Sequence, residues 1–228
     1  MSIRSQPQFA MSAFPPFFDA LPPTLARDEL APGAWVLRGF AQDRAETLLR
    51  EIECIAGTSP FRNLVTPGGK TMSVAMTNCG RVGWFSDRHG YRYTETDPET
   101  GRPWPVMPAF LSRLANDAAS EAGFDDYAPD VCLVNLYEVG ARLTLHRDHD
   151  ERDRRAPIVS VSLGLPATFL FGGLARKNPP RRIPLAHGDV VVWGGPSRMR
   201  YHGVLPIKDD CHPLSGARRY NLTFRVAR

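Results

Sequence analysis

The second half of the chain is divided by Gly and Pro into short stretches of strand-forming residues. The predicted strands lie after Asp130 and cover residues 131–137, 143–148, 158–163, 168–171, 189–193 and 220–226. Many short strands separated by turn residues are typical of two packed antiparallel sheets, a sandwich or a jelly roll. We therefore expect a mainly β fold.

Two helices are expected to flank this β structure. Residues 41–56 carry apolar side chains at helical spacing, and Gly57 follows as a stop signal. Residues 108–122 repeat the pattern before Gly123. Both are interpreted as structural helices packed on the core.

The chain has 228 residues, enough for one compact domain and too few for two full ones. Residues 1–32 contain Phe14-Pro15-Pro16-Phe17-Phe18 and Pro22-Pro23 and predict a loosely ordered arm before a single domain at 33–228. No basic start precedes an unbroken apolar run, which argues against a signal peptide or a membrane span. A net charge of +4 and a pI near 9.0 favour an anionic partner.

The four cysteines show no C-x-x-C pair and no secretory context. They are Cys54, Cys79, Cys132 and Cys211. We expect reduced thiols in a cytoplasmic protein, with a disulfide as the alternative.

Residues 143–151, Leu-Thr-Leu-His-Arg-Asp-His-Asp-Glu, concentrate groups that bind metals. In an extended segment His146 and Asp148 point the same way, because side chains alternate between the two faces. His202, after another apolar run, is the best candidate for a third ligand. Two histidines and one carboxylate form the facial triad of non-haem Fe(II) oxygenases, which leaves three coordination positions open. The alternative for the H-x-D tripeptide is a solvated ion pair. His149, on the opposite face, is not expected to bind metal, and His89, His187 and His212 are interpreted as structural or surface residues.

The last predicted strand has one apolar and one polar face. Tyr220, Leu222 and Phe224 alternate with a polar set that contains Arg219, Asn221, Thr223 and Arg225. Arginines that face inward need an anion, and a dicarboxylate cosubstrate would supply it through paired hydrogen bonds. The alternative is an edge strand whose polar face meets solvent.

A soft apolar surface is predicted between the two helices. Residues 70–77 alternate like a strand and place Met72, Val74 and Met76 on one side, near Trp84, Tyr91 and Tyr93. Such a surface could grip a flat ligand, although an ordinary hairpin core explains the same pattern. Basic clusters at residues 152–155, 176–177 and 181–182 are either solvated loops or the border of a groove that tracks phosphates.

From about Gly33 to its end the chain resembles the AlkB-type Fe(II)- and 2-oxoglutarate-dependent nucleic-acid dealkylases. The matching stretches are residues 66–69, 72–78, 135–137, 146–148, 156–165, 187–195 and 219–225. Ordered motifs over most of a chain are a more specific signal than one short pattern.

This resemblance implies a double-stranded β-helix (jelly roll) core at about 105–228 with an N-terminal nucleotide-recognition lid at about 60–100. It implies that His146, Asp148 and His202 bind Fe(II) and serve as the catalytic metal ligands. The residues implied to bind 2-oxoglutarate are Asn135, Tyr137, Arg219, Asn221 and Arg225. The residues implied to contact substrate are Thr66, Met76, Trp84, Tyr91, Asp150 and Arg176, with Trp84 stacked on a flipped base. Lys70 departs from the family pattern and adds a cation near the phosphates.

The implied activity is oxidative demethylation of N-alkylated bases, of the 1-methyladenine and 3-methylcytosine type. The methyl group is hydroxylated and leaves as formaldehyde, while 2-oxoglutarate and O2 become succinate and CO2. The implied partner is single-stranded or locally opened DNA, or RNA, and we expect a monomer without membrane contact. The alternatives are a dioxygenase of the same fold that acts on RNA or protein, a cupin-type metal protein, and a non-catalytic nucleic-acid-binding module.

Overall fold

A computed structural model describes residues 26–228, so most of the expected N-terminal arm lies outside the described residues. The expected boundary at residue 33 is corrected, because β1 (Arg27–Ala31) already pairs with β2 (Ala34–Leu37). Only Leu30 of β1 is buried, so the strand carries almost no hydrophobic pattern that a sequence could reveal.

The main sheet has eight strands in the order β1-β2-β12-β9-β14-β7-β4-β3, and each strand pairs antiparallel with its neighbours. Its further strands are β3 (Arg62–Val65), β4 (Thr71–Gly80), β7 (Val131–Glu138), β9 (Ile158–Gly164), β12 (Val190–Trp193) and β14 (Arg218–Arg225). The strand β14 lies between β9 and β7, which rules out an edge strand with a solvated polar face.

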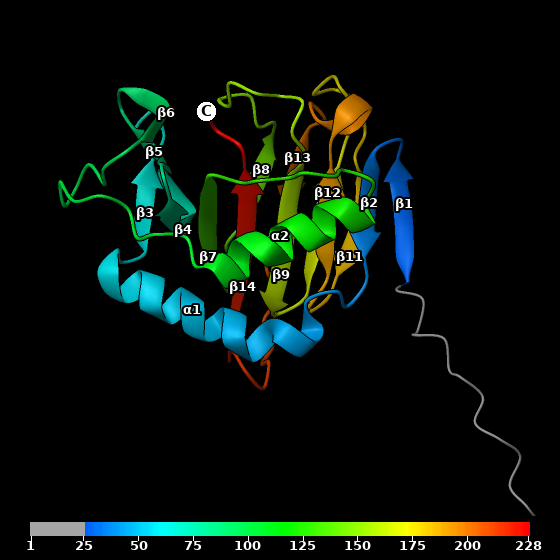
Figure 1. The fold of residues 1–228 in the computed structure, drawn as a ribbon, viewed down its shortest axis with the longest axis horizontal. Helices are drawn as coiled ribbons and strands as arrows, with labels where there is room; N and C mark the ends of the chain where they lie inside the picture. Colours follow the sequence, from blue (N-terminus) through cyan, green and yellow to red (C-terminus); the bar gives the residue numbers. More distant parts are fainter. Residues whose placement is uncertain (1–25) are drawn as a thin grey trace, which may run out of the picture.

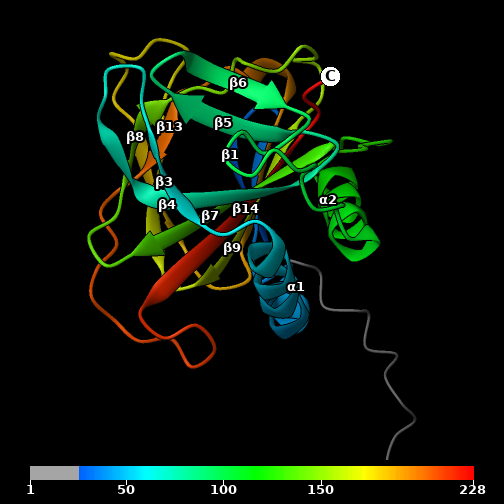
Figure 2. The same cartoon turned by 90° about the vertical axis from the view of Figure 1, so that its left-hand side faces the viewer.

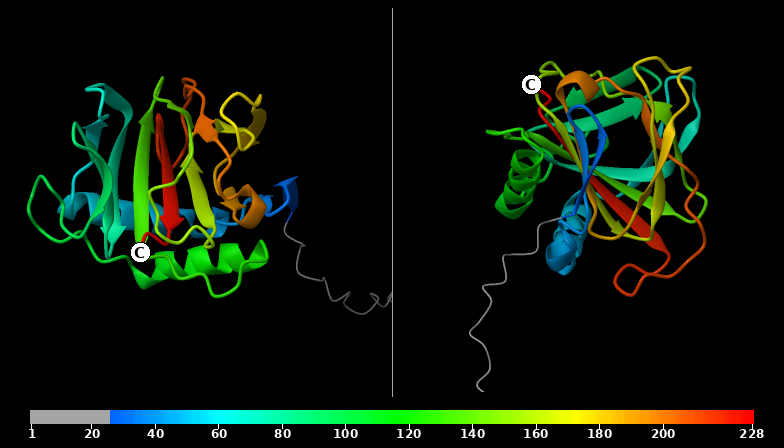
Figure 3. Two further views of the ribbon diagram at one scale, coloured as in Figure 1. Left: turned by 90° about the horizontal axis from the view of Figure 1, so that it is seen from above. Right: turned by 90° about the vertical axis from the view of Figure 1, so that its right-hand side faces the viewer.

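A smaller sheet in the order β11-β10-β13-β8 faces the main one (Figure 2). It consists of β8 (Leu143–His146), β10 (Ala167–Phe171), β11 (Arg181–Leu185) and β13 (His202–Val204). The expected jelly roll is confirmed, and Figure 3 shows the two sheets packed face to face. The hairpin of β5 (Gly83–Asp87) and β6 (Gly90–Thr94) lies over one end, where the lid is expected.

Both helices, α1 (Ala45–Thr58) and α2 (Ala109–Glu121), cover the outer face of the main sheet (Figure 1). The short 3-10 helices η1 (Gln42–Arg44) and η2 (Gly195–Ser197) lie in connections. The helix α1 continues through Gly57, the expected stop, and ends before Pro60. Proline disfavours helical geometry in the residue before it, so Ser59-Pro60 is the true end signal.

Two apolar layers result from this arrangement. One lies between the helices and the main sheet and includes Leu48, Leu114 and Phe224. The other lies between the two sheets and includes Phe169, Trp193 and Val204. The polar face of β14 therefore points to the space between the sheets, which is where a site can form.

All four cysteines are free, as expected. Within residues 26–228 no helix combines the length and the apolar character that crossing a membrane requires.

Candidate metal centre and cosubstrate pocket

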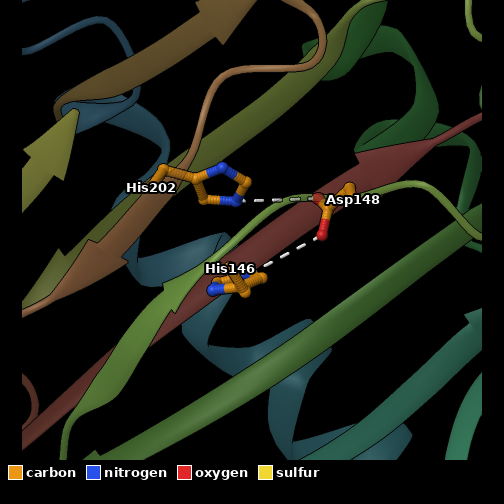
Figure 4. Close-up of side chains that lie close together, drawn as sticks. All are labelled: His146, Asp148 and His202. Atoms are coloured by element: carbon orange, nitrogen blue, oxygen red, sulfur yellow. Dashed lines mark ion pairs between the residues drawn. The ribbon is translucent and has the colours of Figure 1, made fainter. Parts of the chain in front are cut away.

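Three elements bring the predicted metal ligands together. His146 ends β8, Asp148 follows in the next loop, and His202 begins β13 directly opposite His146 in the antiparallel register. Their candidate ligand atoms all lie within 4.8 Å of one another (Figure 4). Metal–ligand bonds of about 2.0–2.2 Å separate neighbouring ligand atoms by roughly 3 Å or more, so small side-chain movements would close this cluster on an ion.

Gly203 allows β13 to lie close to β8. A Cβ at this position would lie 2.7 Å from the carbonyl oxygen of Leu143, closer than real side chains come. The glycine lets β13 approach β8 and so places His202 beside His146. The H-x-D motif was visible in the sequence, whereas this close approach was not.

Backbone contacts set the orientation of both imidazoles. Nδ1 of His146 lies 2.9 Å from the carbonyl oxygen of Thr144, and Nδ1 of His202 lies 3.1 Å from that of Arg200. A carbonyl can only accept, so each Nδ1 carries the proton and each Nε2 keeps its lone pair for a metal. His149 is exposed at the surface, and its Nδ1 lies 3.7 Å from Asp150 Oδ1.

The charge states also suit a metal. Burial would raise the pKa of Asp148, but Arg225 and the two histidines hold that pKa well below its usual range. The Nε atom of Arg225 donates a hydrogen bond to Asp148 Oδ2 at 2.9 Å, and its Nη2 atom lies 2.8 Å from the same oxygen. Burial, together with His146, lowers the pKa of His202 to about 3. At neutral pH the pair is an ionised carboxylate and a neutral imidazole, the forms that bind metals.

Arg219 is a buried cation without a counterion. Its side chain is 1% exposed, and its Nε and NH1 atoms have no hydrogen-bond partner. Its NH2 donates to Ser162 Oγ at 3.0 Å, and its guanidinium lies 4.8 Å from the centre of the Tyr137 ring. No carboxylate in residues 26–228 forms an ion pair with it, and burial lowers its pKa. Because an unpaired buried charge is costly, the site fits a carboxylate from outside the chain.

Two asparagines lie next to Arg219. Asn135 Nδ2 donates to Asn221 Oδ1 at 3.3 Å, and Asn135 Oδ1 is buried without a partner. The amide nitrogen of Asn221 is turned toward Ser160 Oγ at 2.8 Å and the carbonyl oxygen of Val161 at 2.9 Å. Asn221 is therefore engaged mainly with β9, and Asn135 keeps an open acceptor.

One cavity of about 600 Å³ is lined by all of the predicted site residues. They are Thr66, Met76, Trp84, Tyr91, Asn135, Tyr137, His146, Asp148, Asp150, Arg176, His202, Arg219, Asn221 and Arg225. Lys70 also lines this cavity. The metal ligands, the unpaired arginine and the aromatic lid thus share one space.

The lid contributes an aromatic pair. Trp84 and Tyr91 stack with ring centres 5.6 Å apart and planes 16° from parallel. The Trp84 indole Nε1 donates to Asp150 Oδ2 at 3.1 Å. The alternative that Asp150 pairs with Arg152 or Arg154 is not observed, and Arg154 donates to the His149 carbonyl oxygen instead. One face of Trp84 is covered by Tyr91, and the indole fixes the nearby carboxylate.

Sequence reasoning missed a buried network that joins the lid to the loop between β8 and β9, residues 147–157. This loop carries Asp148 and is called the metal loop below. Glu151 accepts from the Tyr93 hydroxyl at 2.6 Å and from Arg198 NH2 at 3.0 Å. Arg198 also donates to the carbonyl oxygen of Asp148 at 3.0 Å. Ser160 and Ser162 on β9 were missed as well, although two serines in an otherwise apolar strand were a visible signal.

Comparison with known proteins agrees with this geometry. Residues 33–225 match the model of the 2OG-Fe(II) oxygenase superfamily, to which the chain belongs. The chain is 58% identical over 201 residues to "Alpha-ketoglutarate-dependent dioxygenase AlkB" of Escherichia coli (strain K12), covering 88% of this chain and 93% of that protein. Within the superfamily it is therefore a member of the AlkB family, with Fe(II) and 2-oxoglutarate as its cofactors.

Two further similarities support this placement. An AlkB homolog of Caulobacter vibrioides is 47% identical over 204 residues, which cover 87% of this chain and 90% of the homolog. The solved structure of OsALKBH1 superposes with a TM-score of 0.78 at 29% identity and covers 88% of this chain and 100% of that chain. Sequence and fold thus agree over the same part of the molecule.

Proposed function

We propose that this protein is an oxidative demethylase that repairs N-alkylated bases of the 1-methyladenine and 3-methylcytosine type in DNA. The observation that carries the proposal is the shared cavity, which combines the His-Asp-His cluster, the unpaired Arg219 and the stacked lid aromatics. The metal cluster and the anion pocket account for the cofactors, and the aromatics account for a flat substrate.

When bound, Fe(II) and 2-oxoglutarate supply the oxidation: 2-oxoglutarate and O2 become succinate and CO2, and the N-methyl group is hydroxylated and leaves as formaldehyde. His146, Asp148 and His202 would hold the iron. Arg219 would pair with the far carboxylate of 2-oxoglutarate, since its Nε and NH1 atoms are free to donate.

The other residues of this pocket position the cosubstrate and the metal ligands. Asn135 and Tyr137 border the carboxylate site beside Arg219, and Asn221 supports Asn135 through their 3.3 Å hydrogen bond. Arg225 holds the Asp148 carboxylate in place through two contacts of 2.8 and 2.9 Å. It therefore acts on the iron side of the cavity.

The lid residues would select the base. The free face of Trp84 can stack on a flipped base, and Met76 adds an adaptable apolar contact. Asp150, fixed by the Trp84 indole, favours bases that carry positive charge after methylation on the pairing edge. Thr66, Tyr91 and Arg176 line the cavity where phosphates would lie.

We further propose that the substrate strand is single-stranded or locally opened and that the protein acts as a cytoplasmic monomer. Extruding a base costs a few kcal/mol, and a methyl group on the pairing edge lowers that cost because it disrupts the base pair. RNA is the alternative substrate. Competition between methylated DNA and RNA oligonucleotides of one sequence decides between them.

The direct test measures formaldehyde and succinate released from an oligonucleotide with one 1-methyladenine, with and without Fe(II). We expect formaldehyde only when Fe(II) and 2-oxoglutarate are both present, with at least one succinate formed for each formaldehyde released. Binding of the oligonucleotide without formaldehyde release would instead support a non-catalytic nucleic-acid-binding module. Failure to bind 2-oxoglutarate would support a cupin-type metal protein.

A further inference from the structure

A second cavity of about 330 Å³ lies beside the active-site cavity. It is lined by Tyr91, Arg92, Tyr93, Asp150, Arg152, Ala227 and Arg228. Tyr91 and Asp150 also line the main cavity, so these two residues form a shared wall. Figures 1 and 2 show the last residues of the chain next to the β5–β6 hairpin, and residues of both segments line this second cavity.

The wall charges of the second cavity favour an anion. Three arginines line it, against one carboxylate, Asp150. Asp150 Oδ2 accepts from the Trp84 indole at 3.1 Å, and Oδ1 lies 3.7 Å from His149 Nδ1. Trp84 and His149 both line the main cavity, so the single carboxylate is engaged on that side.

Arg152 is the cation available for a new partner. Its side chain is exposed and, within residues 26–228, forms no hydrogen bond or ion pair. Its backbone N–H donates to the carbonyl oxygen of Ala227 at 3.2 Å, and the Ala227 N–H donates to Asp130 Oδ1 at 2.7 Å. The chain around Arg152 is therefore anchored while its guanidinium is open.

The other two arginines are held in place by carboxylates that do not line the cavity. Arg92 NH2 lies 2.7 Å from Asp87 Oδ2, and Arg228 NH1 lies 2.5 Å from Glu95 Oε1. A guanidinium has five N–H donors, so each arginine keeps donors for a further acceptor. Such exposed pairs contribute little and exchange partners easily.

We propose that this second cavity is a subsite for one of the two phosphates that flank the flipped nucleotide, with Arg152 as its main donor. The inference rests on the proposed function: the two cavities share Tyr91 and Asp150 in their linings, so a strand whose flipped base enters the main cavity would bring a neighbouring phosphate to the second one. A volume near the lower end for ligand sites suits one phosphate and its sugar. Arginine binds phosphate through paired, charge-assisted hydrogen bonds.

The test uses three trinucleotides with a central 1-methyladenine nucleotide, bound to the anaerobic protein with Fe(II) and 2-oxoglutarate. One has an unmodified phosphate backbone. In each of the other two, a neutral methylphosphonate replaces one of the two phosphates that flank the 1-methyladenine nucleotide. In the wild type, one of the two replacements should raise the Kd roughly tenfold, as expected for the loss of a hydrogen bond to a charged group.

Arg152→Gln should raise the Kd of the unmodified trinucleotide by a similar factor and should abolish the effect of that methylphosphonate. This loss of additivity identifies a direct contact. Arg155→Gln is the matched control: it removes the same charge from the same loop, but Arg155 lines neither cavity and its side chain is 92% exposed. In the Arg155→Gln variant, the methylphosphonate should raise the Kd by the same factor as in the wild type.

If both methylphosphonates weaken binding to Arg152→Gln as much as to the wild type, the subsite is wrong. Formaldehyde release from the unmodified trinucleotide by the wild type separates the two proposals. If formaldehyde is released but the effects of Arg152→Gln and of the methylphosphonate on the Kd are additive, only the phosphate subsite is wrong. If no formaldehyde is released, the proposed function is wrong.

Discussion

The arginines of the interior differ in how they are paired. Arg225 contacts Asp148 and Arg198 contacts Glu151, whereas Arg219 has two unpartnered nitrogen atoms. All three are buried, so the difference lies in the absence of a counterion and not in exposure. This contrast supports the proposal that Arg219 anchors a carboxylate of the cosubstrate.

Arg219→Gln should raise the Kd for 2-oxoglutarate by roughly 30-fold to a few thousand-fold. Truncating one member of a buried charge pair costs on the order of 2–5 kcal/mol, and each decade of affinity is about 1.4 kcal/mol. Arg219→Lys should fall between wild type and Gln, because lysine keeps the charge and loses the planar fork. Titration of the anaerobic Fe(II) protein by charge-transfer absorbance measures these constants.

Iron affinity should barely change in these variants, since the metal ligands are untouched. An unchanged 2-oxoglutarate titration in Arg219→Gln would mean that another residue anchors the cosubstrate.

His202 and His149 offer a second residue-level prediction. His202→Ala should abolish iron binding and turnover, because it removes a ligand of the cluster. His149→Ala should keep both, because His149 is exposed and lies outside the cluster. Iron content per chain and formaldehyde release give the comparison. Equal loss of iron in both variants would contradict the ligand assignment.

At the level of elements, the β5–β6 hairpin is the part of the lid that is hydrogen-bonded to the loop carrying Asp148, Asp150 and Glu151. It contacts the rest of the site through Trp84, which donates to Asp150, and through Tyr93, which donates to Glu151. Both acceptors follow Asp148 in the metal loop. The hairpin and the metal loop are therefore coupled by hydrogen bonds as well as by packing.

Trp84→Ala should weaken binding of a methylated oligonucleotide by roughly 1–3 kcal/mol, the range for stacking on one aromatic side chain. Oxidation of 2-oxoglutarate in the absence of substrate should stay mostly intact, because the Trp84 side chain is hydrogen-bonded to Asp150 and not to a metal ligand. Fluorescence anisotropy gives the affinity, and succinate formation gives the control. An unchanged affinity would refute the stacking role.

At the level of the whole molecule, the buried metal ligands make the apoprotein sensitive to acid. The pKa of His202 is about 3 in the folded protein and 6.5 in its ordinary state, so between these values the unfolded chain binds more protons. Stability conferred by the neutral imidazole is complete above pH 6.5 and is lost as pH falls toward 3. Asp148, whose folded pKa is depressed, adds stability that is lost below its ordinary value of 3.8.

Urea unfolding of the metal-free protein should therefore show a free energy of unfolding that decreases from pH 7 to pH 4.5. The His202 contribution amounts to about 1.4 kcal/mol per pH unit once pH is below 6.5. His202→Gln should reduce this slope, since glutamine does not titrate. The same slope in wild type and variant would show that other groups control the acid sensitivity.

What the sequence determined by itself was the part of the structure that depends on local chain geometry. Alternation in residues 218–225 separated the polar face, with Arg219 and Arg225, from the apolar face, and helical spacing located α1 and α2. The H-x-D spacing paired His146 with Asp148. Together with the family resemblance, these patterns were enough for the fold class and the candidate ligands.

Only the tertiary structure decided which groups meet across the chain. The close approach of β13 to β8 at Gly203, the capture of Arg225 by Asp148 and the burial of Glu151 against Arg198 all join distant segments. Among the strands that the sequence analysis did not predict are β1, β2, β3, β11 and β13, each three to five residues long. So few residues carry little pattern of their own, and their conformation is stabilised by the neighbouring strands to which they pair.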